Sequence, residues 1–237
     1  MITPEKNDVD ISKLFNWGSK FAITNEAGDE IVEYYMKLPG DADINRARVY
    51  ALRKSAELRR KLNDVESDER LAFVAESDLA GRVEIETFIV LTKGRDFWKR
   101  AGKEVNMPFP KEPADDASLE EYELYQAEID SFPERLTEEI TAKILAYNNV
   151  ELDRLSRLTD EEVYKEYVKM SINEMCESEM TRRFRDMTIF FASFKDKDYE
   201  VPFFKVVEEL GNLNAPILNQ FHSNYESLEV GMDDLKK

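Results

Sequence analysis

The sequence of 237 residues contains a single cysteine, Cys176, and a single histidine, His222. One cysteine excludes an internal disulfide framework and a cluster of thiolate ligands. One histidine excludes a histidine-rich metal site. Glycine and proline are also scarce, with eight of each. Sandwiches, barrels and doubly wound sheets need many turns, so this scarcity favours a helical protein.

Long apolar runs are absent as well. No stretch approaches the roughly 18 apolar residues that a membrane-spanning helix needs. The opening residues, MITPEKNDVD, are polar and acidic, which is unlike a signal peptide. These features predict a soluble cytoplasmic protein that does not contact a membrane.

Sequence motifs for common chemistries are missing. Neither the glycine patterns that hold phosphates nor the G-x-S-x-G pattern of hydrolases occurs. His222 has no acidic residue three positions before it, so the Glu-x-x-His ligand pair of di-iron bundles is absent. Glu174 and Glu177 are expected on a solvated helix face, and Cys176 is expected to be a small buried residue rather than a nucleophile. We therefore expect no catalysis, no metal and no cofactor.

Charge is strongly one-sided, with a formal net charge of −17 and an isoelectric point near 4.6. Such a chain repels nucleic-acid phosphates, so a nucleic-acid partner is not expected. The charge is unevenly distributed. Residues 44–62 hold seven bases and one acid, a net +6, whereas residues 112–139 hold eleven acids and one base, a net −10. These two blocks could attract each other, within one molecule or between copies.

The first half of the chain combines a hairpin with helices. Two β-prone runs at 21–38 flank a turn rich in Asn, Gly and Asp, which predicts a β-hairpin. Apolar residues at helical spacing predict a helix over 44–62 and another from Ser67, with interruptions at Gly81 and Gly94. The prolines of residues 106–118 indicate a linker between a unit at 1–105 and a helical unit at 119–237, or a surface loop within one domain.

The second half is expected to be helical. One helix is predicted over 119–132, ending at Pro133, and a second over 137–158. Thr159 followed by three acids is typical of a helix start, and the helix is expected to reach 194. Such a helix is unusually long, so a break near Ser178 stays open as an alternative. The fold class is therefore mainly α, a helical bundle-like body with an N-terminal β-hairpin. The expected core positions are Ile144, Leu155, Phe184, Phe190 and Phe191.

Residues 170–204 are rich in methionine and phenylalanine. Such residues usually form core, but flexible methionines also suit a groove that receives an apolar helix from a partner. The candidate protein-binding residues are Met170, Met175, Met180, Met187, Phe203 and Phe204.

The layout of these elements resembles that of bacteriophage tail assembly chaperones. The segments that carry the resemblance are FAITNEAGDEIVEYYMKLPG, DADINRARVYALRKSAELRRKL, the acidic helical body and the ending NQFHSNYESLEVGMDDLKK. The resemblance implies a non-enzymatic protein of the host cytoplasm that binds the tape measure protein, and sometimes tail tube subunits, before assembly. The expected partners are another protein, such as a long helical client, and a second copy of the chain. Two alternatives stay open: a structural component retained in a virion or other particle, and an acidic DNA mimic or nucleic-acid-linked regulator.

Overall fold

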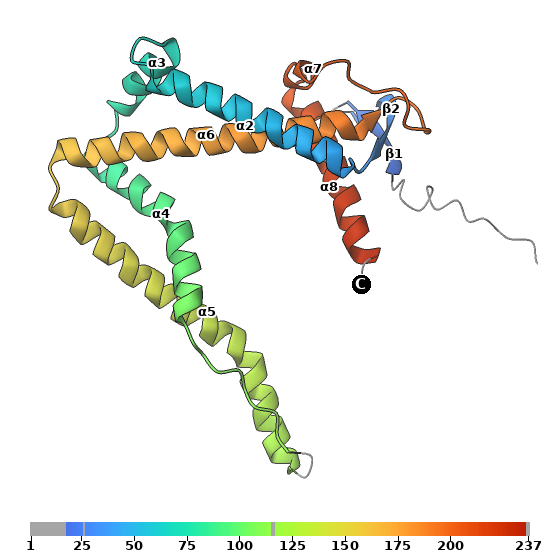
Figure 1. Cartoon of the computed structure of the whole chain (residues 1–237). Coiled ribbons are helices and arrows are strands. Elements are labelled where there is room, and N and C mark those ends of the chain that lie inside the picture. The colour runs from blue at the N-terminus through green and yellow to red at the C-terminus, as the bar shows by residue number, and fades with distance from the viewer. Residues whose placement is uncertain (1–17, 26, 115–116, 236–237) are drawn as a thin grey trace, which may run out of the picture. The chain divides into compact units, whose positions relative to one another are not determined.

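The computed structural model describes residues 18–235 except residue 26 and residues 115–116, and it describes the side chains as far as residue 229. The opening ten residues, on which the expectation about a signal peptide rests, lie outside this range. The chain forms two compact units. The first unit comprises residues up to 63 and from 175 onward, and the second comprises residues 64–174. Figure 1 follows the chain by colour.

The described residues confirm the predicted fold class, because helices dominate and a β-hairpin precedes them. The helices are α2 (Asp41–Asn63), α3 (Asp68–Ser77), α4 (Arg82–Glu104), α5 (Leu119–Ser156), α6 (Asp160–Ala192), α7 (Glu208–Gly211) and α8 (Ala215–Leu235). None of the helices in this part of the chain combines the length and the apolar character that a membrane span requires.

The first unit is built on the predicted hairpin of β1 (Gly18–Thr24) and β2 (Glu30–Lys37). At the turn, the Asn25 side chain accepts hydrogen bonds from two backbone amides, and Gly28 adopts a positive φ of 88°, which glycine tolerates best. A third strand, β3 (Ser193–Phe194), pairs with β2. Two residues are too short to produce an alternating pattern, so the sequence did not reveal this strand.

Helix α8 packs against the hairpin and joins distant parts of the chain. The Gln220 side chain accepts a hydrogen bond from the Thr24 amide (2.8 Å) and donates one to the Thr24 carbonyl (2.9 Å). Asn224 donates to the buried Tyr34 hydroxyl (2.8 Å). An apolar cluster fills the interior of this unit; its largest members include Tyr34, Met36, Ile189, Phe204, Leu210 and Phe221.

In the second unit, the helix predicted from Ser67 is split into α3 and α4, and the split lies just before Arg82, at the Gly81 that weakens the prediction of one unbroken helix. The predicted interruption at Gly94 is wrong, because α4 continues through it to Glu104. A single interior glycine costs only about 1 kcal/mol relative to alanine, and packing against α5 outweighs this cost. The described residues of the proline-rich segment, 106–114 and 117–118, form an extended connection between α4 and α5 and lie within this second unit.

Helix α5 corrects another expectation, because Pro133 does not end it. The helix runs unbroken from Leu119 to Ser156 with the proline inside. Proline removes one backbone hydrogen bond from a helix interior. Here Pro133 is exposed, so water can bind the carbonyl group that loses its helical partner, and the Thr137 hydroxyl donates to the Pro133 carbonyl (2.7 Å).

Helix α6 begins as predicted and is longer than an average helix. The Thr159 hydroxyl accepts a hydrogen bond from the Glu162 amide, while the Glu162 carboxylate accepts from the Thr159 amide (2.9 Å). These reciprocal bonds form a capping box. The suggested break near Ser178 is absent, and the helix ends at Ala192.

The core predictions are partly right. Leu155 is fully buried, but Ile144, Phe184, Phe190 and Phe191 are only half-buried. A helix buries only the face that its neighbours cover. On α6, the positions that neighbouring elements cover are occupied by other residues, including Ile172, Cys176, Ile189 and Ala192.

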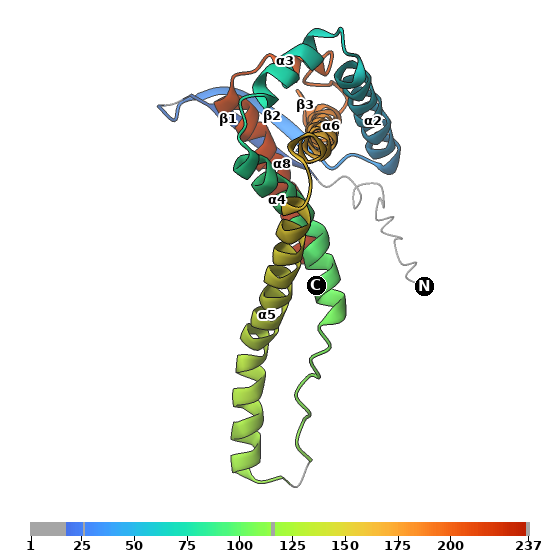
Figure 2. The same ribbon diagram turned by 90° about the vertical axis from the view of Figure 1, so that its left-hand side faces the viewer.

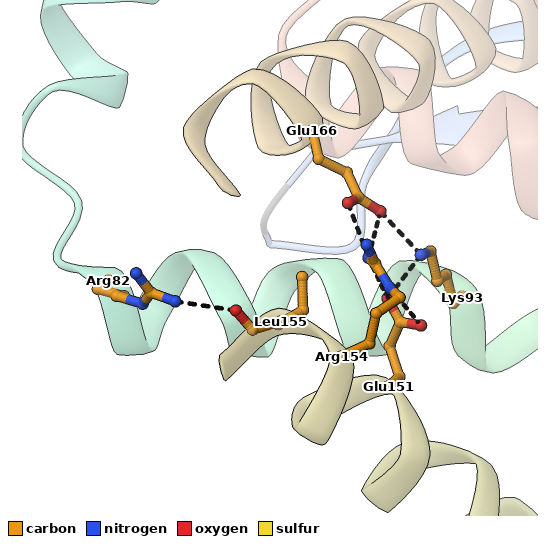
Figure 3. Close-up of polar contacts among 6 residues, drawn as sticks. All are labelled: Arg82, Lys93, Glu151, Arg154, Leu155 and Glu166. Atoms are coloured by element: carbon orange, nitrogen blue, oxygen red, sulfur yellow. Dashed lines mark hydrogen bonds and ion pairs between the residues drawn. The ribbon is translucent and has the colours of Figure 1, made fainter. Parts of the chain in front are cut away.

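Four charged side chains join α4, α5 and α6 in the second unit (Figure 3). Lys93 forms ion pairs with Glu151 (2.6 Å) and Glu166 (2.8 Å), and Arg154 bonds to the same two carboxylates. Burial acts to raise the pKa of both carboxyl groups, but the hydrogen bonds from Arg154 and Lys93 outweigh it, so each pKa lies below its ordinary value. Arg82 also donates to the carbonyl of Leu155 near the end of α5 (2.9 Å). We call the four charged residues the ion-pair network.

Candidate protein-binding groove

The basic helix α2 lies beside α6 within the first unit, as Figures 1 and 2 both show. Ala47 and Ala51 are buried, and their small side chains allow α2 to approach its neighbours closely. The Ser55 hydroxyl donates a hydrogen bond to the Cys176 carbonyl of α6 (2.8 Å). These contacts fix the position of α2 along this part of α6.

A groove of about 480 Å³ opens between the two helices. Its apolar lining comes from Val49 and Tyr50 of α2 and from Met187 and Phe191 of α6. Val49 is 48% exposed, although it is aliphatic. The remaining lining residues are Ala42, Asn45, Arg46 and Arg53, all from α2. We call this feature the α2–α6 groove.

Two arginines place positive charge beside the apolar lining. Arg46 and Arg53 are two turns apart on α2, and both are exposed. Arg46 contacts Asp43 (3.2 Å), but its side chain remains 70% exposed. Arg53 makes no ion pair within the described part of the chain. Both guanidinium groups can therefore bind an acidic group on a partner.

Charged side chains of α6 lie close to the groove-lining Met187. Asp186 is almost buried, and the nearest cation is the Arg183 guanidinium at 4.0 Å. Burial raises the pKa of the Asp186 carboxyl, and nearby arginines only partly oppose this effect. Arg183 bonds mainly to Glu179 (2.8 Å), whose carboxylate raises the pKa of the guanidinium. This part of α6 therefore contains a carboxylate with little compensation for its burial.

The six candidate residues from the sequence occupy different environments. Met187 lines the groove. Met175 is 39% exposed on α6, and Met180 is half-buried. Phe203 is half-buried against the core of the first unit, and Phe204 lies inside that core. The sixth, Met170, packs against the apolar cluster of the second unit.

The residues considered for chemistry are not gathered into a site. Cys176 is buried, and burial raises the pKa of its thiol, which disfavours the thiolate. His222 is half-buried, and burial lowers its pKa. Within the described ranges, no three His, Cys, Asp or Glu side chains are placed so that they could hold a metal ion.

Sequence reasoning missed most of the groove. Arg46 and Arg53 belong to the basic block at 44–62, Phe191 is an expected core residue and Met187 a candidate binding residue, but the sequence does not connect them. Val49 and Tyr50 were not singled out. The available signal was the coincidence of exposed apolar residues and arginines at helical spacing on one segment.

Family models, curated proteins and solved structures were all compared with the chain, and none matches it.

Proposed function

We propose that the protein binds another protein through the α2–α6 groove and holds an amphipathic helix there without catalytic turnover. The ligand helix has an apolar stripe flanked by acidic side chains. The observation that carries this proposal is the combination of an apolar lining with two exposed arginines, Arg46 and Arg53.

The shape of the groove favours a helical ligand. Grooves between helices typically receive the apolar face of a third helix, whose side chains at positions i, i+3, i+4 and i+7 point the same way. Met187 supports such binding because an unbranched side chain can repack around different ligands. An assembly chaperone would use this arrangement to cover the apolar face of a long helical client.

The charges favour an acidic flank on that helix. Residues 44–62 carry +6 in a chain of −17, so the rest of the chain carries −17 − 6 = −23. A uniformly acidic ligand is repelled by most of the chain and attracted to α2. Complementary charge of this kind selects the partner and speeds association.

The test uses a fluorescent helical peptide of about 21 residues with leucines at alternating three- and four-residue spacing and glutamates beside them. We expect it to bind the full-length protein, as measured by fluorescence anisotropy. The double variant Arg46→Glu/Arg53→Glu should weaken binding at least tenfold. A matched control, Arg48→Glu/Arg60→Glu, changes the charge of α2 equally but leaves the groove lining intact.

Three further measurements decide the assignment. A peptide with lysine in place of glutamate should bind more weakly, and raised salt should weaken the acidic peptide. We call Arg46→Glu/Arg53→Glu the groove variant. If it binds the acidic peptide as tightly as the control Arg48→Glu/Arg60→Glu does, the groove is not the binding site. Tighter binding of duplex DNA than of the acidic peptide would replace the proposal with the nucleic-acid alternative.

A further inference from the structure

The chain itself contains a helix of the kind that the α2–α6 groove requires. Residues 119–140, the distal part of α5, carry eight acids and one base, a net −7. We call this segment the acidic arm. Its least exposed side chains recur every three or four residues. They form an apolar stripe that consists mainly of Tyr125, Ile129, Phe132, Leu136 and Ile140.

The stripe of the acidic arm is only partly covered within the second unit. The buried residues of α5 in the described structure are Glu151 and Leu155, both outside the arm. Helix α4 ends at Glu104, which contacts Lys143 and Tyr147. Beyond that point, Figure 2 shows α5 accompanied by the extended connection instead of a helix.

The described residues of the extended connection contact the arm through aromatic side chains. Phe109 packs edge-on against Phe132, with 5.1 Å between ring centroids, and the Tyr122 hydroxyl donates to the Ala114 carbonyl (3.4 Å). Even so, Phe109 remains 63% exposed and Leu124 65% exposed. On the arm itself, Tyr122 and Leu124 are both exposed, and apolar side chains gathered in this way on one element are typical of an interaction surface.

Charge determines which surface the arm fits. Two arms of −7 repel each other, so arm-to-arm pairing is disfavoured. Helix α2 offers the opposite charge, with +6 over residues 44–62, and its groove has an apolar lining. We propose that the acidic arm of one copy of the chain docks in the α2–α6 groove of a second copy. This inference rests on the proposed function and names a partner for the same groove.

Such an interface is heterologous, because it joins two different surfaces of the same chain. It leaves a free arm on one copy and a free groove on the other, so assembly continues into longer chains or closes as a ring or reciprocal pair. A helical client that enters the groove would compete with the arm. Self-association is therefore expected to fall when client is added.

The experiment measures the mass of the full-length protein by sedimentation velocity over a range of concentrations at low salt. We expect the mass to rise from one copy to two or more with concentration, and to fall again when salt is added. Arg46→Glu/Arg53→Glu should keep the protein monomeric. Glu128→Lys/Glu139→Lys should have the same effect, because each of these two acids directly precedes a stripe residue and therefore flanks the stripe. The control Glu123→Lys/Glu134→Lys changes the same charge on the opposite face and should still associate.

Mixing the two charge-reversed variants gives the decisive measurement. A mixture of the groove variant and the arm variant should associate again, since the groove variant keeps an intact acidic arm and the arm variant keeps an intact groove, while the two reversed surfaces are also complementary in charge. A full-length protein that stays monomeric at all concentrations would overturn the inference, as would association unaffected by either variant. If the protein stays monomeric but binds the acidic peptide, the second-copy inference fails and the proposed function stands. If the acidic peptide does not bind, the proposed function itself is wrong, and the inference that rests on it falls with it.

Discussion

Replacement of Leu155 by alanine tests the packing of the second unit. Leu155 is fully buried and belongs to a cluster with Ile85, Ile89, Val90 and Val163. The substitution removes three carbon atoms, worth about 2.4 kcal/mol at about 0.8 kcal/mol per buried methylene. The cavity left behind adds to this transfer cost, and such substitutions cost about 2–5 kcal/mol in total. We expect a loss of about 3 kcal/mol.

Hydrogen exchange is the appropriate assay, because a chain with two compact units need not unfold in one step. A loss of about 3 kcal/mol corresponds to exchange faster by roughly a hundredfold for the best-protected amides of α4 and α5. The control is Leu145→Ala on the same helix, where the side chain is 58% exposed. It should change stability by less than about 0.5 kcal/mol. Equal effects of the two substitutions would show that Leu155 is not a core residue.

Three further predictions concern single side chains. Glu166→Gln should lower the free energy of unfolding by about 1–3 kcal/mol at pH 7, because the ion-pair network loses a charged acceptor. Since the pKa of Glu166 lies below its ordinary value of 4.5, the difference in stability from the unmodified protein, measured by urea titration, should shrink as the pH falls below that value. Asp186→Asn should raise the urea midpoint at pH 7, because burial raises the pKa of the carboxyl and its ionisation destabilises the folded protein as the pH rises through that pKa. An equal rise of the urea midpoint at pH 3, below the ordinary pKa of 3.8, would contradict this reasoning. Gly18→Ala should lower the melting temperature, with a loss of about 1–3 kcal/mol in stability, because an added Cβ would lie 2.6 Å from the Met36 carbonyl oxygen. Gly40→Ala is the control and should leave the melting temperature unchanged, because a Cβ there has no neighbouring atom within 4 Å.

Periodicity along the sequence was sufficient to predict the hairpin, α2 and the start of α6, because these elements depend on local patterns and caps. The break near Ser178 was suggested only by the length of α6, whereas the boundaries at Gly94 and Pro133 have one shared reason for their failure. A local residue preference amounts to about 1–3 kcal/mol, and the rest of a long helix can outweigh it. The strand β3 is missed because its position depends on pairing with β2 instead of on its own two residues.

The groove was less predictable than the fold. Its two walls are separated by more than 130 residues in the sequence, since Val49 faces the same space as Met187. Composition identified α2 as basic and α6 as rich in methionine and phenylalanine, but it could not show that the two helices lie together. The six candidate residues were chosen by type, and Phe204 shows that residue type does not distinguish a core position from a binding position.

The hydrogen bonds between Thr24 and Gln220 have a consequence for the order of folding. They join residues 196 positions apart, so the first unit cannot be completed until most of the chain has left the ribosome. The second unit is one continuous segment, residues 64–174, and can fold earlier during synthesis. While the second unit folds, the apolar face of the hairpin therefore remains uncovered. On this basis we expect nascent chains stopped before α8 to have a protease-resistant second unit and a protease-sensitive hairpin.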